Sequence, residues 1–479
     1  MIVHRLPYIL YRNYKEFGYL TDNRNFGYDT ATKSCMKVGD LLLSKVGCVF
    51  YSKLLDTSQE MDAVITQLCE LFPEVQSSVI REDAEDFFME LYSKGFIYCG
   101  EASDVATIRS QYFSYNNTRP YELSILQENN NLSVYESTFG ESPRLTRVHI
   151  DISSRCNERC IHCYIPTAKK CGTMTEKMFD DILHQCKEMN VLNITISGGE
   201  PMLNPCLKDF LLKCRENNFS VNLLSNLTLL TDELLDVISE NSLISVQTSL
   251  YAMDANVHDT ITGNRGSYQK TLSAIKRLRE KDVPLQINCP IMKQNHNHYK
   301  EVIRFANSLN IEADTDYSLF GCYDLSRSNL SCRLSIEEIR SIIEEESLEP
   351  QNRGSIEESI ENKRTEPDDQ ICPVCKNSLC ISNTGNVYPC EGWQSLILGN
   401  LSKQSLNEIW KGVPETNHLR NLTFRDFPQC NACLDKKFCN ICLIMNTNES
   451  CSGSYTDIND FQCKVAALKH HAYKVRKGS

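Results

Sequence analysis

Apolar runs of strand length alternate with amphipathic stretches from residue 145 to residue 335. Helical patterns such as 175–189 and 266–280 lie between these runs. Alternation of this kind predicts a parallel sheet built from βαβ units, and therefore an α/β fold. Six repeats suit either a partial (β/α)6 TIM-like barrel or an open sheet. The six apolar runs are RVHIDI, LNITISG, SVNLLSN, ISVQTSL, LQINCPI and ADTDYSLF.

Residues 1–100 combine short strand-like segments with three helical stretches. Thr57 or Ser58 is a suitable N-cap for the second helix, and Gly95 is a suitable end for the third. The pattern predicts a small winged-helix-like unit. The predicted strands are YILYRNY, FGYLTDNRNFGYDT and FIYCG, and the predicted helices cover 38–53, 55–72 and 79–95.

The remaining segments divide by composition. Residues 101–144 are polar and rich in Asn, as in a connector. Residues 336–370 are acidic and predict a helix followed by a linker. Residues 371–479 are rich in cysteine and poor in long periodic patterns, and a small domain of that kind usually needs metal to fold.

Composition and charge narrow the classes of function. The net charge of −12 argues against a nucleic-acid partner and against an anionic membrane surface. No run approaches the ~20 apolar residues that a membrane helix needs. Polar residues also interrupt the start of the chain, which therefore lacks a signal-peptide core. With 24 cysteines, these features favour a cytoplasmic metalloprotein over a secreted disulfide framework.

Three cysteines follow the first apolar run. Cys156, Cys160 and Cys163 are spaced C-x3-C-x2-C, at the end of a strand where barrels carry their active-site loops. Three thiolates can hold three irons of a [4Fe–4S] cluster and leave the fourth iron open to a ligand. A zinc site completed by His162, or buried core cysteines, are the alternatives.

Polar residues and glycines end the next three apolar runs. Gly198 and Gly199, within ISGGEP, permit a close approach of the backbone to a ligand, and Glu200 can accept from an ammonium group. Asn226 and Ser249 end the third and fourth runs, where a polar residue either contacts a ligand or caps a strand.

The three-cysteine loop and GGEP, one strand–helix unit apart, resemble the radical S-adenosylmethionine (SAM) superfamily. The resemblance implies a partial barrel with a [4Fe–4S] cluster on the three cysteines, beside His162. It implies that residues 198–200 hold the SAM amino group and that Asn226 and Ser249 contact its ribose and carboxylate. It also implies that an external one-electron donor, such as flavodoxin or ferredoxin, reduces the cluster. The resulting 5′-deoxyadenosyl radical then takes hydrogen from a substrate.

The C-terminal cysteines have a second characteristic spacing. With the glycine turn NTGNVYPC they resemble the SPASM domain, which implies two further [4Fe–4S] clusters and three in all. Zinc is the alternative metal, and Cys380 competes with Cys372 for the nearer cluster. By resemblance, the nearer cluster is held by Cys372, Cys375, Cys390 and Cys442, and the farther one by Cys430, Cys433, Cys439 and Cys463.

The N-terminal unit is not suited to DNA, because five acidic residues on its third helix would repel phosphate. It resembles the RiPP recognition element, which implies capture of a precursor-peptide leader by β-augmentation. A purely structural helical domain is the alternative.

The three parts in this order resemble sactisynthase-like maturases. That resemblance implies a cross-link in a ribosomally synthesised peptide, above all a cysteine thioether. Carbon–carbon or ether cross-linking, epimerisation and side-chain oxidation use the same machinery, and a zinc-stabilised peptide-binding scaffold is the non-enzyme alternative. The sequence identifies no catalytic acid or base.

Overall fold

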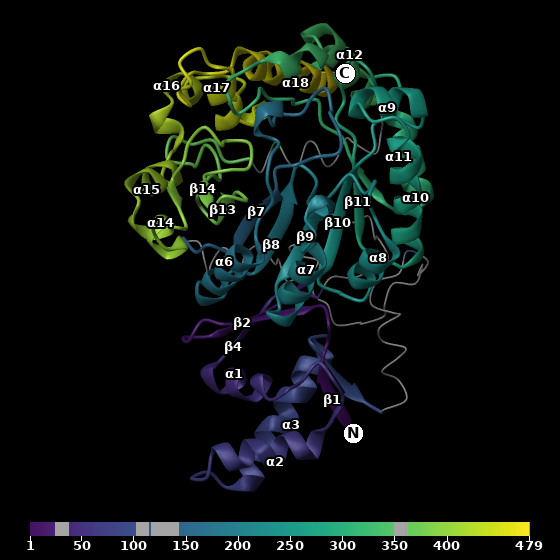
Figure 1. Cartoon of the computed structure of the whole chain (residues 1–479). Coiled ribbons are helices and arrows are strands. Elements are labelled where there is room, and N and C mark those ends of the chain that lie inside the picture. The colour runs from purple at the N-terminus through teal and green to yellow at the C-terminus, as the bar shows by residue number, and fades with distance from the viewer. Residues whose placement is uncertain (24–37, 102–114, 116–142, 349–359, 361–362, 479) are drawn as a thin grey trace.

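The computed structural model describes residues 1–23, 38–101, 115, 143–348, 360 and 363–478. The N-terminal unit lies at one end of the molecule, the parallel strands lie in the middle, and helices of the C-terminal region lie at the other end (Figure 1). Most of the predicted connector, residues 102–114 and 116–142, and much of the predicted linker, residues 349–359 and 361–362, lie outside the described residues.

The N-terminal unit contains two small antiparallel sheets, ordered β5-β1-β6 and β2-β3-β4. The predicted helix 38–53 is wrong in its first half, because residues 41–43 pair with β3 and the helix begins after Ser44, whose side chain accepts from the Gly47 amide. The elements are β1 (Ile2–Arg5), β2 (Ile9–Asn13), β3 (Gly18–Asp22), β4 (Leu41–Leu43), α1 (Lys45–Ser52), β5 (Gln59–Glu60), α2 (Met61–Leu71), α3 (Ser77–Ser93) and β6 (Ile97–Gly100).

The ends of the other two helices test the predicted caps. Neither Thr57 nor Ser58 caps α2, because Gln59 and Glu60 pair with β1 and the helix starts at Met61. Gly95 does follow the end of α3 and has a positive φ of 79°, a conformation in which glycine has no steric cost.

The N-terminal unit packs against the amino ends of the barrel strands. Leu10 and Tyr14 share a core with Leu192 and Leu243, which stand just before β8 and β10. Arg12 is buried there and donates to the backbone oxygen of Val191 at 3.0 Å. The unit therefore lies at the opposite end of the strands from their carboxyl ends.

Six parallel strands with helices between them form the partial barrel, so the predicted α/β barrel is confirmed. Along β7, Val148, Ile150 and Ile152 are fully buried against the helices, while the alternate side chains face the inside. The strands are β7 (Arg147–Ser153), β8 (Asn193–Gly198), β9 (Ser220–Leu224), β10 (Ile244–Ser249), β11 (Leu285–Asn288) and β12 (Glu312–Asp314). The helices are α6 (Glu176–Glu188), α7 (Leu207–Glu216), α8 (Asp232–Ser239), α9 (Ala255–Thr262), α10 (Ser267–Glu280) and α11 (Tyr299–Ser308), with 3-10 turns at Thr167–Lys169, Pro201–Leu203 and Ser328–Cys332.

The C-terminal region continues the same sheet. Strand β13 (Ser378–Ile381) pairs in parallel with β7 and starts a hairpin with β14 (Asn386–Tyr388), which pairs with β15 (Gly399–Asn400). The result is one nine-stranded sheet across the boundary that composition placed at residue 371. The remaining elements are α12 (Ile336–Leu348), α14 (Leu406–Gly412), α15 (Pro414–Arg420), α16 (Pro428–Asn431), α17 (Leu443–Glu449) and α18 (Asp460–Gly478), with 3-10 turns at Phe424–Asp426 and Lys436–Phe438.

Two helices differ in how well the sequence predicted them. The helix expected at the start of the acidic stretch is α12, which packs against α18. The 19 residues of α18 were not predicted, because its cysteine-containing sequence lacks a strong apolar stripe. No helix within the described ranges is long and apolar enough to cross a membrane.

Candidate active site

A cavity of about 440 Å³ opens at the carboxyl ends of the barrel strands, and Cys156, Cys160 and Cys163 all line it. Backbone bonds fix their loop to α9, with the Arg159 amide donating to the Thr262 oxygen at 2.8 Å. Burial raises the pKa of Cys156 to about 11. Burial also raises that of Cys160, with further contributions from nearby Glu158 and Cys163. Cys156 and Cys160 would therefore keep their protons near neutral pH unless a metal compensated their charge.

The spacing of the three sulfurs is too wide for a single zinc ion. Two thiolates on one tetrahedral zinc, with Zn–S bonds of about 2.3 Å, lie about 3.8 Å apart. Among the described residues, the cavity cysteines do not form a group whose ligand atoms all lie within 4.8 Å of one another. A larger group such as a [4Fe–4S] cluster fits this donor set better than the zinc alternative.

His162 lines the same cavity but its contacts are not those of a fourth zinc ligand. Its Nε2 lies 3.3 Å from the hydroxyl of Tyr251, and burial lowers the pKa of His162 to about 4. Its Nδ1 is buried and has no hydrogen-bond partner among the described residues. A neutral imidazole with an unpaired nitrogen at the cavity is free to meet a bound cofactor.

The two glycines of GGEP are required by the protein's own packing. A Cβ on Gly198 would lie 2.0 Å from the Ser153 oxygen, and one on Gly199 would lie 2.4 Å from the Arg155 oxygen. Gly198 also has a φ of +128°. The close approach that the sequence suggested is therefore made to the cysteine loop, while both glycines also line the cavity.

Glu200 is fully buried and is not among the residues that line the cavity. Its carboxylate accepts from the Ser225 hydroxyl at 2.7 Å, from the Asn226 amide at 2.8 Å and from the Met202 amide at 2.9 Å. These bonds join the end of β8 to the end of β9. Contact with a SAM amino group therefore stays a prediction for Glu200, and its visible work is to position Asn226.

Asn226 and Ser249 both line the cavity, as expected for cofactor contacts. The Asn226 side chain is also bound within the protein, because it donates to Asn157 at 3.0 Å and accepts from Thr228 at 2.7 Å. The capping role that the sequence left open is thus present in Asn226, and the assigned ribose and carboxylate contacts stay predictions.

Several cavity residues were missed in the sequence. Gln247, Asn288 and Asp314 line the cavity from β10, β11 and β12. Their signal was available, since each is a polar residue at an inward position of a predicted strand. Glu158, between the first two cysteines, was missed for lack of any pattern, and burial raises its pKa to about 7.

The C-terminal cysteines gather into two sets. Cys430, Cys433, Cys439 and Cys463 line one small cavity of about 60 Å³, although 20 or more residues separate Cys463 from the others. These are the four thiols that the resemblance assigns to the farther cluster.

The other set surrounds Cys442 at the start of α17. Burial raises the pKa of Cys442 to about 11, and neighbouring Cys372 adds to that shift; Cys442 in turn contributes to the raised pKa of Cys390. Cys372 likewise lies close enough to affect Cys375. Cys380 lies opposite His149 in the sheet, and its pKa is raised by burial and by nearby Asp151, Glu391 and Cys390. The assignment of Cys372 rather than Cys380 to the nearer set therefore stays a prediction.

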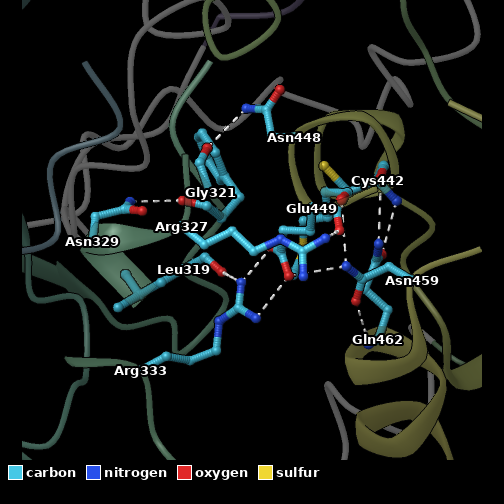
Figure 2. A network of polar contacts seen from close by, with 12 residues as sticks. Leu319, Gly321, Arg327, Asn329, Arg333, Cys442, Asn448, Glu449, Asn459 and Gln462 are labelled. Carbon is cyan, nitrogen blue, oxygen red and sulfur yellow. Dashed lines mark hydrogen bonds and ion pairs between the residues drawn. The ribbon is translucent and has the colours of Figure 1, made fainter. Parts of the chain in front are cut away.

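A buried ion pair connects this C-terminal set to the wall of the cavity (Figure 2). Arg333 donates to both carboxylate oxygens of Glu449 and to the backbone oxygen of Leu319, which lines the cavity. The two charged side chains are only 10% and 9% exposed. Asn459 donates to Glu449 at 3.1 Å, and Gln462 accepts from the Cys442 amide at 2.9 Å.

A second link in Figure 2 joins the same two regions. Asn448 donates to the backbone oxygen of Gly321 at 2.8 Å, as Figure 2 shows. It also donates to the backbone oxygen of Gly392 at 3.1 Å, and Gly392 lies two residues after Cys390. Asn329 donates to the backbone oxygen of His162 at 3.1 Å. The loop at the cavity wall is thus fixed to both cysteine regions.

Comparison with known proteins identifies two domains. Residues 150–306 match the Radical SAM superfamily, and residues 372–434 match the iron–sulfur cluster-binding domain SPASM. The chain is 24% identical over 325 residues to the AdoMet-dependent heme synthase of Methanosarcina barkeri, covering 63% of this chain and 91% of that protein. It is 24% identical over 298 residues to a PqqA peptide cyclase of Bradyrhizobium diazoefficiens, covering 60% and 78%.

The fold is shared along nearly the whole chain with SuiB of Streptococcus suis, solved bound to the precursor peptide SuiA. That similarity covers 96% of this chain and 99% of SuiB, with a TM-score of 0.59 and 17% identity.

Proposed function

Since this chain is a radical SAM enzyme that carries a SPASM domain, we propose that it modifies a ribosomally synthesised precursor peptide by installing a cysteine thioether cross-link. The observation that carries the proposal is the presence, in one chain, of a cavity of about 440 Å³ lined by three thiols, together with two further groups of thiols in the C-terminal region. The shared fold with SuiB, whose structure was solved with a precursor peptide, and the likeness to a PqqA peptide cyclase support a peptide as substrate.

Three [4Fe–4S] clusters and SAM are the proposed cofactors. Cys156, Cys160 and Cys163 would hold the first cluster, and the two C-terminal sets would hold the others. When bound, the first cluster and SAM supply a 5′-deoxyadenosyl radical that takes a hydrogen atom from the substrate. The backbone amides of Gly199 and Glu200 fix the start of the cysteine loop by donating to the oxygens of Ser153 and Arg155. The cavity wall that includes Leu319 helps to exclude water from the reaction.

Formation of the cross-link requires an electron acceptor, and we assign this role to a cluster held by the C-terminal cysteines. Forming a carbon–sulfur bond removes a hydrogen atom from carbon, a proton from the thiol and one further electron. A cluster held by the nearer set would accept that electron. The bonds from Asn448 and Arg333 to the cavity wall support this role, because they connect the wall to the helix that follows Cys442. An external donor such as flavodoxin or ferredoxin would supply the electron that starts each cycle, in a cytoplasm that keeps the thiols reduced.

The N-terminal unit is the proposed site of leader capture. Within the described residues, 13 large apolar side chains are exposed and nine of them belong to residues 1–100. Leu42 on β4 and Val46 on α1 are two of these, and β4 pairs with only one of the described strands. An exposed apolar surface beside an edge strand favours binding of an extended peptide by β-augmentation. The nine residues are Met1, Leu42, Val46, Leu55, Leu71, Val75, Val79, Met89 and Tyr92.

The position of this unit sets a minimum length for the substrate. The unit packs at the amino ends of the strands, whereas the cavity opens at their carboxyl ends. The longest strand, β7, has seven residues and therefore spans about 23 Å. At least about seven extended peptide residues must lie between the captured leader and the modified residue.

The deciding experiment is co-expression with the small peptide encoded beside the gene, followed by mass spectrometry. The expected result is a loss of two hydrogen atoms per cross-link, absent with the Cys156→Ala/Cys160→Ala/Cys163→Ala variant. Fragmentation of the product then locates the bond. If fragmentation shows a carbon–carbon or ether bond, that bond takes the place of the thioether in the proposal. An unchanged peptide mass in ordinary water, together with the uptake of one deuterium when the reaction runs in deuterated water, would identify an epimerase instead.

Leader capture has its own test. Leu42→Asp and Val46→Asp should weaken binding of the peptide by at least tenfold, because each places a charge on the apolar surface. Leu434→Asp is the matched control, since Leu434 is 88% exposed but lies in the C-terminal region. Wild-type affinity in all three variants would exclude the surface formed by β4 and α1 as the peptide-binding site.

A further inference from the structure

A group of three metal-ligating side chains lies where the C-terminal region joins the barrel. His149 and Asp151 belong to β7, and Cys380 belongs to β13. In the part of the chain that the structure describes, this is the one group of three His, Cys, Asp or Glu residues whose ligand atoms all lie within 4.8 Å of one another. Neither cysteine set includes Cys380, so the group has no part in the function proposed above.

Strand geometry explains why these three side chains converge. His149 and Asp151 are two residues apart on one strand, so they point to the same face of the sheet. Cys380 is the register partner of His149 in the neighbouring strand and shares that face. On the other side of β7, Asp151 is the partner of Ser197, which lines the cavity. The group therefore lies on the cavity face of the sheet, one strand beyond the cavity itself.

The distances within the group are close to those of a metal site. His149 Nε2 and Asp151 Oδ1 are 3.0 Å apart. Two ligands bound about 2.0 Å from a tetrahedral zinc would be separated by about 3.3 Å. Gln394 donates to the other oxygen of Asp151 at 2.7 Å, as an outer partner that fixes the orientation of a ligating carboxylate.

The site is enclosed but not sealed. The side chains of His149 and Asp151 are 15% and 11% exposed, and Cys380 is fully buried. The slight exposure of His149 and Asp151 gives an ion a route to the site, with the buried Cys380 thiol as the innermost ligand. Without an ion, Asp151 is paired with His149 and Gln394. A divalent ion would take the place of the proton between His149 and Asp151 and would compensate the charge of a Cys380 thiolate.

We propose that His149, Asp151 and Cys380 bind one zinc ion at the junction of β7 and β13. One thiolate, one imidazole and one carboxylate are all common zinc ligands. Three protein ligands leave a fourth position open, as in catalytic rather than structural zinc sites. The ion would hold the C-terminal region to the barrel and place a Lewis acid beside the reaction cavity.

The test uses the full-length enzyme with its iron–sulfur clusters reconstituted, then equilibrated with zinc sulfate and desalted. Metal analysis should give one zinc per chain without loss of iron. X-ray absorption at the zinc edge should show one sulfur at about 2.3 Å, with the other ligands nitrogen or oxygen at about 2.0–2.2 Å. Cys380→Ala should lose the zinc, while Cys451→Ala, which removes an exposed thiol elsewhere, should keep it.

Each other outcome overturns the proposal. A shell of four sulfurs would mean that zinc had entered a cluster site, and absence of bound zinc would mean that there is no site. Retention of zinc in the Cys380→Ala variant would exclude the thiol as a ligand. If that variant also loses iron, Asp151→Asn, which keeps the shape of the side chain, decides between loss of the site and loss of the fold. Peptide modification is measured separately, so neither proposal depends on the other.

Discussion

Replacing Glu449 by alanine should loosen the contact between the cavity wall and the C-terminal region. The change leaves the Arg333 guanidinium buried without the carboxylate that both of its terminal nitrogens contact. Removing one partner of a buried ion pair costs about 3–5 kcal/mol, because the remaining charge stays desolvated. The loss should be local, since the pair joins two segments and not the sheet itself.

Hydrogen exchange measures that loss directly. Amide exchange in segments 319–333 and 443–462 should accelerate by about 100-fold or more, since each 1.4 kcal/mol corresponds to about tenfold. The double variant Arg333→Met/Glu449→Ala should recover most of the protection, because no unpaired charge remains. Its residual cost is about 1–2 kcal/mol from Asn459 and the Leu319 oxygen, which each lose a partner.

The control is Glu233→Ala, which breaks the pair of Glu233 with Lys208 on the surface. Both side chains of that pair are largely exposed, so the exchange rates of the two segments should not change. Wild-type exchange in Glu449→Ala, or a double variant that exchanges as fast as the single one, would refute the reasoning. Slower peptide modification with unchanged leader binding should accompany the loosened contact, because the cavity wall moves and the N-terminal unit does not.

Three further outcomes are expected. Gly199→Ala should lower the melting temperature and weaken SAM binding in equilibrium dialysis, because the added Cβ would push the cysteine loop away. Gly412→Ala is the control and should change neither, because nothing lies within 4 Å of the added Cβ. Cys433→Ser should remove about a third of the iron if each of three sites holds four irons, while Cys451→Ser should leave the iron content unchanged. Arg12→Met should make the contact between the N-terminal unit and the barrel more accessible to limited proteolysis, because it removes the bond from Arg12 to the amino end of the barrel. SAM binding should not change, because Arg12 does not line the cavity.

Local patterns in the sequence were sufficient for the barrel and for the first cysteine site. Apolar runs and helical periodicity are set by neighbouring residues, and five of the six predicted strands of the barrel form along most of their length. The sixth, predicted over 313–320, forms only at its first two residues, because β12 ends at Asp314. The spacing of Cys156, Cys160 and Cys163 confines them to one loop, so their convergence on the cavity needed no knowledge of distant contacts. In the N-terminal unit, the same reasoning failed at residues 38–43, where pairing with β3 outweighed a helical pattern.

Tertiary structure alone decided the relations between distant segments. Only folding shows that β13 extends the barrel sheet and that Cys380 lies opposite His149. The grouping of Cys463 with Cys430 was expected only from a family resemblance, and the fold brings both thiols to one cavity. The fold also brings Arg333 and Glu449, which are 116 residues apart in the sequence, into one buried ion pair. The physical reason is that spacing along the chain constrains only side chains on the same turn, loop or strand. Contacts between remote residues depend on which packing buries the most apolar surface and satisfies the buried polar groups.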